Sequence, residues 1–159
     1  MFKEAYQTTP PAVLAADTDI VGAHKYKSFW YTCKNYRANI FFDGDSLYFR
    51  DIQKFDERYR ERYLDKPCHK WDAVYDNLPV VDERKWSVEK DSHDAGLDFD
   101  GKFVYNSMKR DGNALVITAN SESGKKVEIR MDEESITVSG NVKLIWRFGT
   151  FSDYTVGAS

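Results

Sequence analysis

Apolar and polar residues alternate along several short stretches of the chain, which is the pattern of half-buried β-strands. The most regular stretch runs from Lys102 to Phe148, and we predict five antiparallel strands there, joined by short turns. An Asp-Gly pair at residues 111–112 favours a two-residue hairpin turn. A second turn, at residues 139–141, would place Val138 opposite Val142 with both side chains on one face. This half of the chain is therefore predicted to be one antiparallel meander.

A second meander is predicted in the N-terminal half. Residues 28–33 and 36–42 alternate in the same way, and an Asp-Gly pair at residues 43–44 leads into a third strand at residues 47–50. The register of this turn divides the side chains between the two faces of the sheet. The core-facing set is Phe29, Tyr31, Ala38, Ile40, Leu47 and Phe49.

Each meander has one apolar face, and two such faces are buried most simply by packing on each other. We therefore predict an all-β fold with a minor helical part, in which two antiparallel meanders pack as a β-sandwich; a closed β-barrel is the alternative. The helical part is a short amphipathic helix at residues 55–64, with a charged loop as the alternative. Residues 25–149 form the single domain, residues 1–24 an N-terminal tail or linker, and residues 150–159 a C-terminal tail.

Composition and charge narrow the classes of partner. The 159-residue chain has a net charge of −3, with acidic and basic residues interspersed. Because no basic stripe and no long apolar run occur, we expect no nucleic-acid partner and no membrane span. The apolar stretch at residues 12–16 is too short for a signal-peptide core, so we expect either a cytoplasmic protein or a mature domain excised from an extracellular one. Cys33 and Cys68 leave a disulfide and two buried thiols as alternatives.

No residue pattern indicates catalysis or a bound metal. The three histidines, His24, His69 and His93, lack the spacing of zinc ligands, and neither a nucleophile elbow nor a phosphate-binding loop occurs. Carboxylate pairs such as Asp98 and Asp100 fall where strands turn, which is a common position for aspartate. We therefore assign no catalytic residue, no metal site and no cofactor, and keep a small enzyme with paired carboxylates as one alternative function.

The outward face of the N-terminal meander is rich in aromatic and planar polar side chains. Its outward residues are Trp30, Arg37, Asn39, Phe41, Tyr48 and Arg50. Outward strand positions commonly carry small polar residues, so this composition indicates either a ligand surface or a covered face. The predicted register sets Arg37 opposite Arg50, and Asp51 or a bound carboxylate or sulfate would relieve that repulsion. Trp71 and Tyr75 either extend this surface or fold over it as a second small core.

Aromatic rings beside arginine and asparagine suit carbohydrate, because sugar C–H faces stack on rings and sugar hydroxyls bind planar polar groups. The favoured hypothesis is a non-catalytic carbohydrate-binding or accessory module of a larger carbohydrate-active protein. Its predicted ligand-binding residues are Trp30, Arg37, Asn39, Tyr48, Arg50, Trp71 and Tyr75. The alternative is a structural or protein-interaction domain whose aromatic face docks on a flanking domain.

Overall fold

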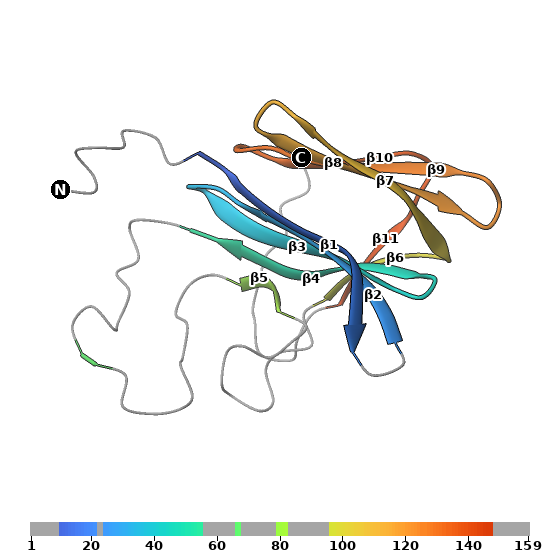
Figure 1. The fold of residues 1–159 in the computed structure, drawn as a ribbon, viewed down its shortest axis with the longest axis horizontal. Helices are drawn as coiled ribbons and strands as arrows, with labels where there is room; N and C mark the ends of the chain where they lie inside the picture. Colours follow the sequence, from blue (N-terminus) through green and yellow to red (C-terminus); the bar gives the residue numbers. More distant parts are fainter. Residues whose placement is uncertain (1–9, 22–23, 56–65, 68–78, 83–95, 148–159) are drawn as a thin grey trace.

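The two predicted apolar faces pack on each other in the computed structural model, which describes residues 10–21, 24–55, 66–67, 79–82 and 96–147 (Figure 1). Within these residues the chain forms eleven β-strands and no helix. Seven strands form one sheet: β1 (Ala12–Val21), β2 (His24–Thr32), β3 (Tyr36–Asp43), β4 (Ser46–Lys54), β5 (Pro79–Asp82), β6 (Gly96–Phe99) and β11 (Leu144–Arg147). Four form the other: β7 (Phe103–Asp111), β8 (Ala114–Ser121), β9 (Lys126–Met131) and β10 (Ile136–Ser139).

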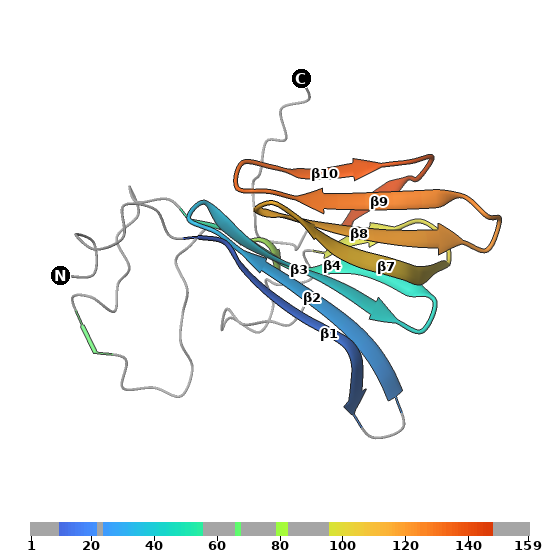
Figure 2. The same ribbon diagram turned by 45° about the horizontal axis from the view of Figure 1, so that its top comes forward.

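Both sheets are open and antiparallel. The larger sheet has the order β1-β2-β3-β4-β6-β11, with β5 also pairing with β4, and the smaller has the order β10-β9-β8-β7. Every described pair of neighbouring strands is antiparallel. The smaller sheet lies over the larger one, and neither closes on itself (Figure 2). The predicted β-sandwich is therefore confirmed, and the barrel alternative is wrong.

The core lies between the sheets and contains the residues predicted to face inward. Phe29 and Ile40 are fully buried and belong to one cluster with Ile129 of the facing sheet. The Phe29 ring stacks on Tyr105 of β7 with the ring centroids 5.3 Å apart. Burial of apolar surface, worth about 25 cal/mol per Å², is the main attraction between the two layers.

The last strand belongs to a different sheet from the one predicted. The turn at residues 139–141 does not close a hairpin, because β11 crosses to the seven-stranded sheet and pairs with β6. Leu144 lies opposite Phe99, not opposite Ile136 as the predicted register requires. Alternation along a strand determines which side chains share a face, but it does not determine which other strand pairs with it. The five-stranded meander is therefore a four-stranded one followed by a crossover.

Both Asp-Gly hairpins form, each with its turn one residue later than predicted. Asp43 pairs with Ser46, and Asp111 pairs with Ala114, so each two-residue loop begins at the glycine. These two glycines have φ angles of 62° and 59°, which side chains with a Cβ adopt at a cost. Moving a turn by one residue shifts the pairing by two, so next to the turns the side chains keep their predicted faces.

Ten residues within the predicted N-terminal tail form a strand. Residues 12–21 are β1, which pairs with β2 and extends the large sheet by one strand. The register shifts between Ala16 and Asp19, so no period of two runs through the whole segment. The strand begins directly after Pro10 and Pro11, and its irregular register removes the alternation that would mark it in the sequence.

Several predictions fall outside the described residues. They are residues 56–64 of the helix predicted at residues 55–64, the C-terminal tail at residues 150–159, and the side chains of Cys68, Trp71 and Tyr75. Cys33 is described and carries a free, buried thiol, so it is not in a disulfide. The described part of the chain contains no helix that is long and apolar enough to cross a membrane.

Candidate functional site

The predicted binding residues that the structure describes share the outer face of the seven-stranded sheet, which points away from the four-stranded sheet. Trp30 of β2 lies directly opposite Asn39 of β3, and Tyr48 of β4 lies opposite Phe41. The Arg50 guanidinium carbon is 4.4 Å from the centroid of the Phe41 ring and 5.6 Å from that of Trp30. Strand alternation thus brings these side chains together, while Trp71 and Tyr75 lie outside the described residues.

A β-bulge in β4 shapes the centre of this face. Ile40 pairs with Phe49, but the next pair is Asn39 with Asp51, which leaves Arg50 as an extra residue in β4. A bulge sets two residues against one and disturbs the alternation locally. As a result, two consecutive residues, Arg50 and Asp51, both contact side chains of the outer face.

The predicted opposition of Arg37 and Arg50 is wrong, because the bulge and the turn shift set Arg37 opposite Gln53. The Arg37 guanidinium instead donates two hydrogen bonds to Asp51, from Nε to Oδ1 and from Nη2 to Oδ2, each 3.1 Å long. The Asp51 side chain is 3% exposed and that of Arg37 is 32% exposed. An internal carboxylate therefore balances Arg37, and the paired bonds fix the plane of its guanidinium.

Asn39 is fully buried, and it lies opposite Trp30 of β2 on one side and Asp51 of β4 on the other. Its Nδ2 donates to Ser28 Oγ at 3.0 Å and to the Phe29 carbonyl at 3.1 Å. Among the described residues, its Oδ1 has no hydrogen-bond partner although it is buried. A buried hydrogen-bond acceptor left unpaired costs about 1–3 kcal/mol of folding free energy. The buried amide of Asn39 is therefore an unusual feature of the outer face.

The centre of the outer face is covered, which is one of the two alternatives that the sequence leaves open. Phe41 is only 3% exposed, and its ring lies between those of Tyr26 and Tyr48. The ring centroids are 5.3 Å apart for Tyr26 and 5.5 Å apart for Tyr48. Arg50 lies over the same ring and contributes a cation–π contact. Trp30, Tyr48 and Arg50 themselves are half-buried.

A hollow of about 330 Å³ opens at the end of the outer face next to β1. It is lined by Ala12, Val13, Leu14, Trp30, Thr32 and Arg37. Trp30 lies opposite Leu14, a residue that is 68% exposed, and Thr32 lies opposite Ala12. Two of the lining residues, Trp30 and Arg37, were predicted from the sequence. The other four were missed because three belong to the unpredicted strand β1 and Thr32 carries no distinctive signal.

A second hollow, the inter-sheet cleft, has a volume of about 420 Å³ and lies where the two sheets part. Its apolar walls include Ile136 and Val138 of β10, and Leu144 and Trp146 of β11. Its lining is completed by Asn35, Tyr36, Phe49, Ile52, Lys54, Leu97, Glu134 and Ser135. Trp146 is 40% exposed, whereas the alternation of its strand places it on the apolar face and so predicts a core residue.

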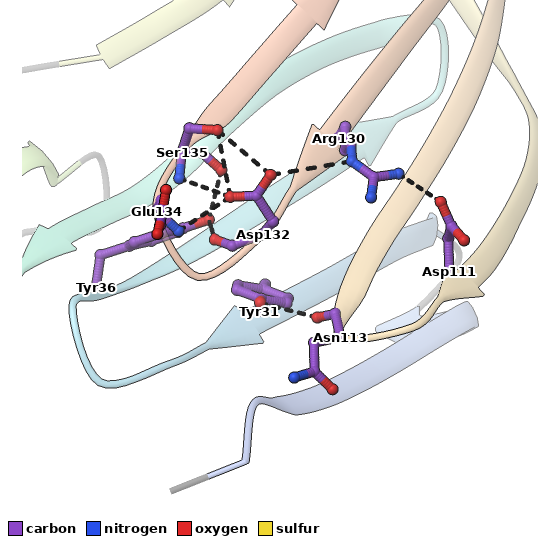
Figure 3. Close-up of polar contacts among 8 residues, drawn as sticks. All are labelled: Tyr31, Tyr36, Asp111, Asn113, Arg130, Asp132, Glu134 and Ser135. Carbon is purple, nitrogen blue, oxygen red and sulfur yellow. Dashed lines mark hydrogen bonds and ion pairs between the residues drawn. The ribbon is translucent and has the colours of Figure 1, made fainter. Parts of the chain in front are cut away.

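A polar cluster joins the two sheets at the end of the sandwich beside this cleft (Figure 3). The Tyr36 hydroxyl lies within hydrogen-bond distance of the Asp132 and Ser135 carbonyls, and the Tyr31 hydroxyl donates to the Asn113 carbonyl at 2.9 Å. Burial raises the pKa of Tyr31 to about 12 and also raises that of Tyr36. Both phenols are therefore neutral at pH 7 and act as cross-links between the sheets.

Carboxylates at this end of the sandwich are engaged by nearby donors. Asp132 Oδ1 accepts hydrogen bonds from the backbone N–H groups of Glu134 and Ser135, and these bonds lower the pKa of Asp132. Arg130 Nη1 lies 2.7 Å from Asp111 Oδ2, and this ion pair lowers the pKa of the Asp111 carboxyl. Among the residues that the structure describes, no group of three or more His, Cys, Asp or Glu side chains is placed to hold a metal ion.

Neither family models nor curated proteins nor solved structures give a match to this chain. A function therefore has to be inferred from the described side chains themselves. Of the two hollows, the one on the outer face combines a ring with polar hydrogen-bonding groups, and the inter-sheet cleft is mainly apolar.

Proposed function

We propose that this chain is a non-catalytic, ligand-binding β-sandwich that binds a carbohydrate in the outer-face hollow, as an accessory module of a larger carbohydrate-active protein. The observation that carries the proposal is the half-buried Trp30 ring beside the Thr32 hydroxyl and the Arg37 guanidinium, all lining one hollow. A sugar ring offers C–H groups to an indole face and hydroxyls to polar neighbours, so this combination matches its chemistry.

The Arg37–Asp51 pair supports the proposal because it holds the polar part of the hollow in place before any ligand arrives. Two of the five guanidinium N–H donors of Arg37 are directed to Asp51. Side chains that are already ordered lose less conformational entropy on binding, which favours recognition of a small ligand. Asp51 itself is buried and engaged by Arg37, so its role here is to orient the guanidinium.

The main test is a binding screen of soluble glycans by tryptophan fluorescence and calorimetry. We expect at least one glycan to bind, and Trp30→Ala to weaken binding about ten-fold or more through loss of the stacking surface. Trp146→Ala is the matched control, because Trp146 is an exposed tryptophan of the inter-sheet cleft and its loss should leave glycan affinity unchanged. A folded wild-type chain that binds no glycan, or equal losses in the two variants, contradicts the proposal.

A docking role remains the second candidate, and the exposed Leu14 favours it. Leu14 belongs to β1, the edge strand of the large sheet, and lies at the mouth of the same hollow. Under this alternative the chain binds a flanking domain through the hollow, and no glycan changes its fluorescence. Leu14→Asp then weakens docking, whereas a bound sugar would tolerate a more polar rim.

A further inference from the structure

We infer that the inter-sheet cleft, together with the outer edge of β10, accepts an extended peptide segment of a partner protein that adds a fifth strand to the four-stranded sheet. The segment carries apolar side chains at alternate positions, which enter the cleft, and hydrogen-bonds its backbone to β10. This site is separate from the outer-face hollow, and the inference does not depend on carbohydrate binding.

The first observation is that apolar side chains pointing into the sandwich remain exposed at one side of it. Leu144 and Trp146 lie opposite Phe99 and Leu97 in the register of β11 with β6. Phe99 and Leu97 belong to the buried core, so Leu144 and Trp146 point toward the four-stranded sheet as well. Yet Leu144 is 38% exposed and Trp146 is 40% exposed, so these inward-facing residues are incompletely covered.

The second observation is that the smaller sheet ends above this region. β10 is its last strand, and among the described residues β10 pairs with β9 alone (Figure 2). Ile136 and Val138 of β10 are half-buried and line the cleft with Leu144 and Trp146. A further strand would lie about 4.8 Å from β10 and about 10 Å above the large sheet, which is the position of the cleft.

An extended peptide fits this site better than a small apolar molecule does. In the part of the chain that the structure describes, no strand pairs with the outer edge of β10, and an added strand satisfies the backbone N–H and C=O groups of that edge. Alternate side chains of that strand enter the cleft, which is continuous with the inter-sheet core through Phe49 and Leu97. The occupant therefore needs both an unpaired backbone and a period of two in its apolar residues.

The experiment uses the whole chain and two labelled peptide pools of about ten residues, a usual strand length. In one pool Val, Ile, Leu or Phe alternates with Thr or Lys, and in the other the same residues form blocks. We expect the alternating pool to bind and to slow amide hydrogen exchange in residues 136–139, with weaker binding of the blocked pool. No binding of either pool up to roughly 1 mM overturns the inference.

Backbone pairing is tested with peptides N-methylated at every second residue, in the two possible phases. An edge strand bonds through one side of its backbone, so one phase should bind like the parent peptide and the other about ten-fold more weakly or less. Equal affinity of the two phases, or binding without slower exchange in β10, shows that the peptide is held by apolar contacts alone and overturns the added strand.

Two charge variants of β10 locate the peptide. Val138→Glu places a charge in the cleft and should abolish binding, while Thr137→Glu, on the exposed opposite side of the same strand, should preserve it. If Val138→Glu does not fold, Leu144→Glu on the facing strand tests the same wall. Equal binding by the variants overturns the inference. Concentration-dependent dimers blocked by Val138→Glu also overturn it, because the occupant is then a second copy of this chain.

Discussion

Replacing Gly140 with alanine is expected to lower the free energy of unfolding by about 3–5 kcal/mol. Gly140 lies between β10 and β11, where the chain leaves one sheet for the other, and its φ is 124°. An added Cβ would sit 2.5 Å from the Lys126 carbonyl oxygen and 3.3 Å from the Val127 Cα. Both atoms belong to the backbone of β9, which is fixed by its pairing on either side, so neither can move aside cheaply.

Two other glycines provide matched controls for this substitution. Gly44 and Gly112 also have positive φ, but a Cβ at either would meet no atom within 4 Å. Alanine at these positions should cost only the left-handed backbone strain, about 1–2 kcal/mol. Urea unfolding of the three variants separates the effects. An equal loss at Gly140 and Gly44 would mean that the crossover does not pack tightly against β9.

The strand pattern could be predicted over most of the described chain because alternation directly reflects burial on one side of a sheet. Phe29 and Leu47 are buried as predicted, and Trp30 lies on the opposite face from both. Each Asp-Gly pair predicted a hairpin because only a few residues adopt positive φ without strain. These signals are local, so a single sequence contains them.

The remaining features depend on contacts between distant segments. The bulge at Arg50 has no local marker, and it changes the partner of Arg37 from a repelling arginine to the buried Asp51. β11 joins the large sheet because it pairs with the edge of β6 that β4 does not use. The alternation around Leu144 is compatible with either sheet. The outer-face hollow was predicted only in part, because one of its walls is β1, whose irregular register conceals it.

The second large effect is expected in alkaline solution, where Tyr31 and Tyr36 should make the fold sensitive to pH. Burial is the main cause that raises the pKa of Tyr31 to about 12 and raises the pKa of Tyr36, and the electrostatic effect of the nearby Cys33 side chain adds to both. The ring centroids of the two tyrosines are 5.7 Å apart, so ionisation of one also hinders ionisation of the other.

The direction of this pH effect follows from the number of protons that the folded and the unfolded chain bind. Between the ordinary tyrosine pKa of about 10 and the raised values, the unfolded chain has lost the phenolic protons and the folded chain keeps them. The free energy of unfolding should therefore be unaffected by these groups below about pH 10. Above that pH it should fall by about 1.4 kcal/mol per pH unit for each tyrosine, or about 3 kcal/mol per unit for both.

Tyr36→Phe tests this assignment through the shape of the pH curve. At pH 7 the variant should be less stable by about 1–2 kcal/mol, because the carbonyls of Asp132 and Ser135 lose their phenolic donor. As the pH rises above about 10, its stability should fall with half the wild-type slope, so the difference between the proteins shrinks. Urea unfolding from pH 7 upward measures both curves. Parallel curves would show that Tyr36 does not contribute to the alkaline loss, and that other groups carry it.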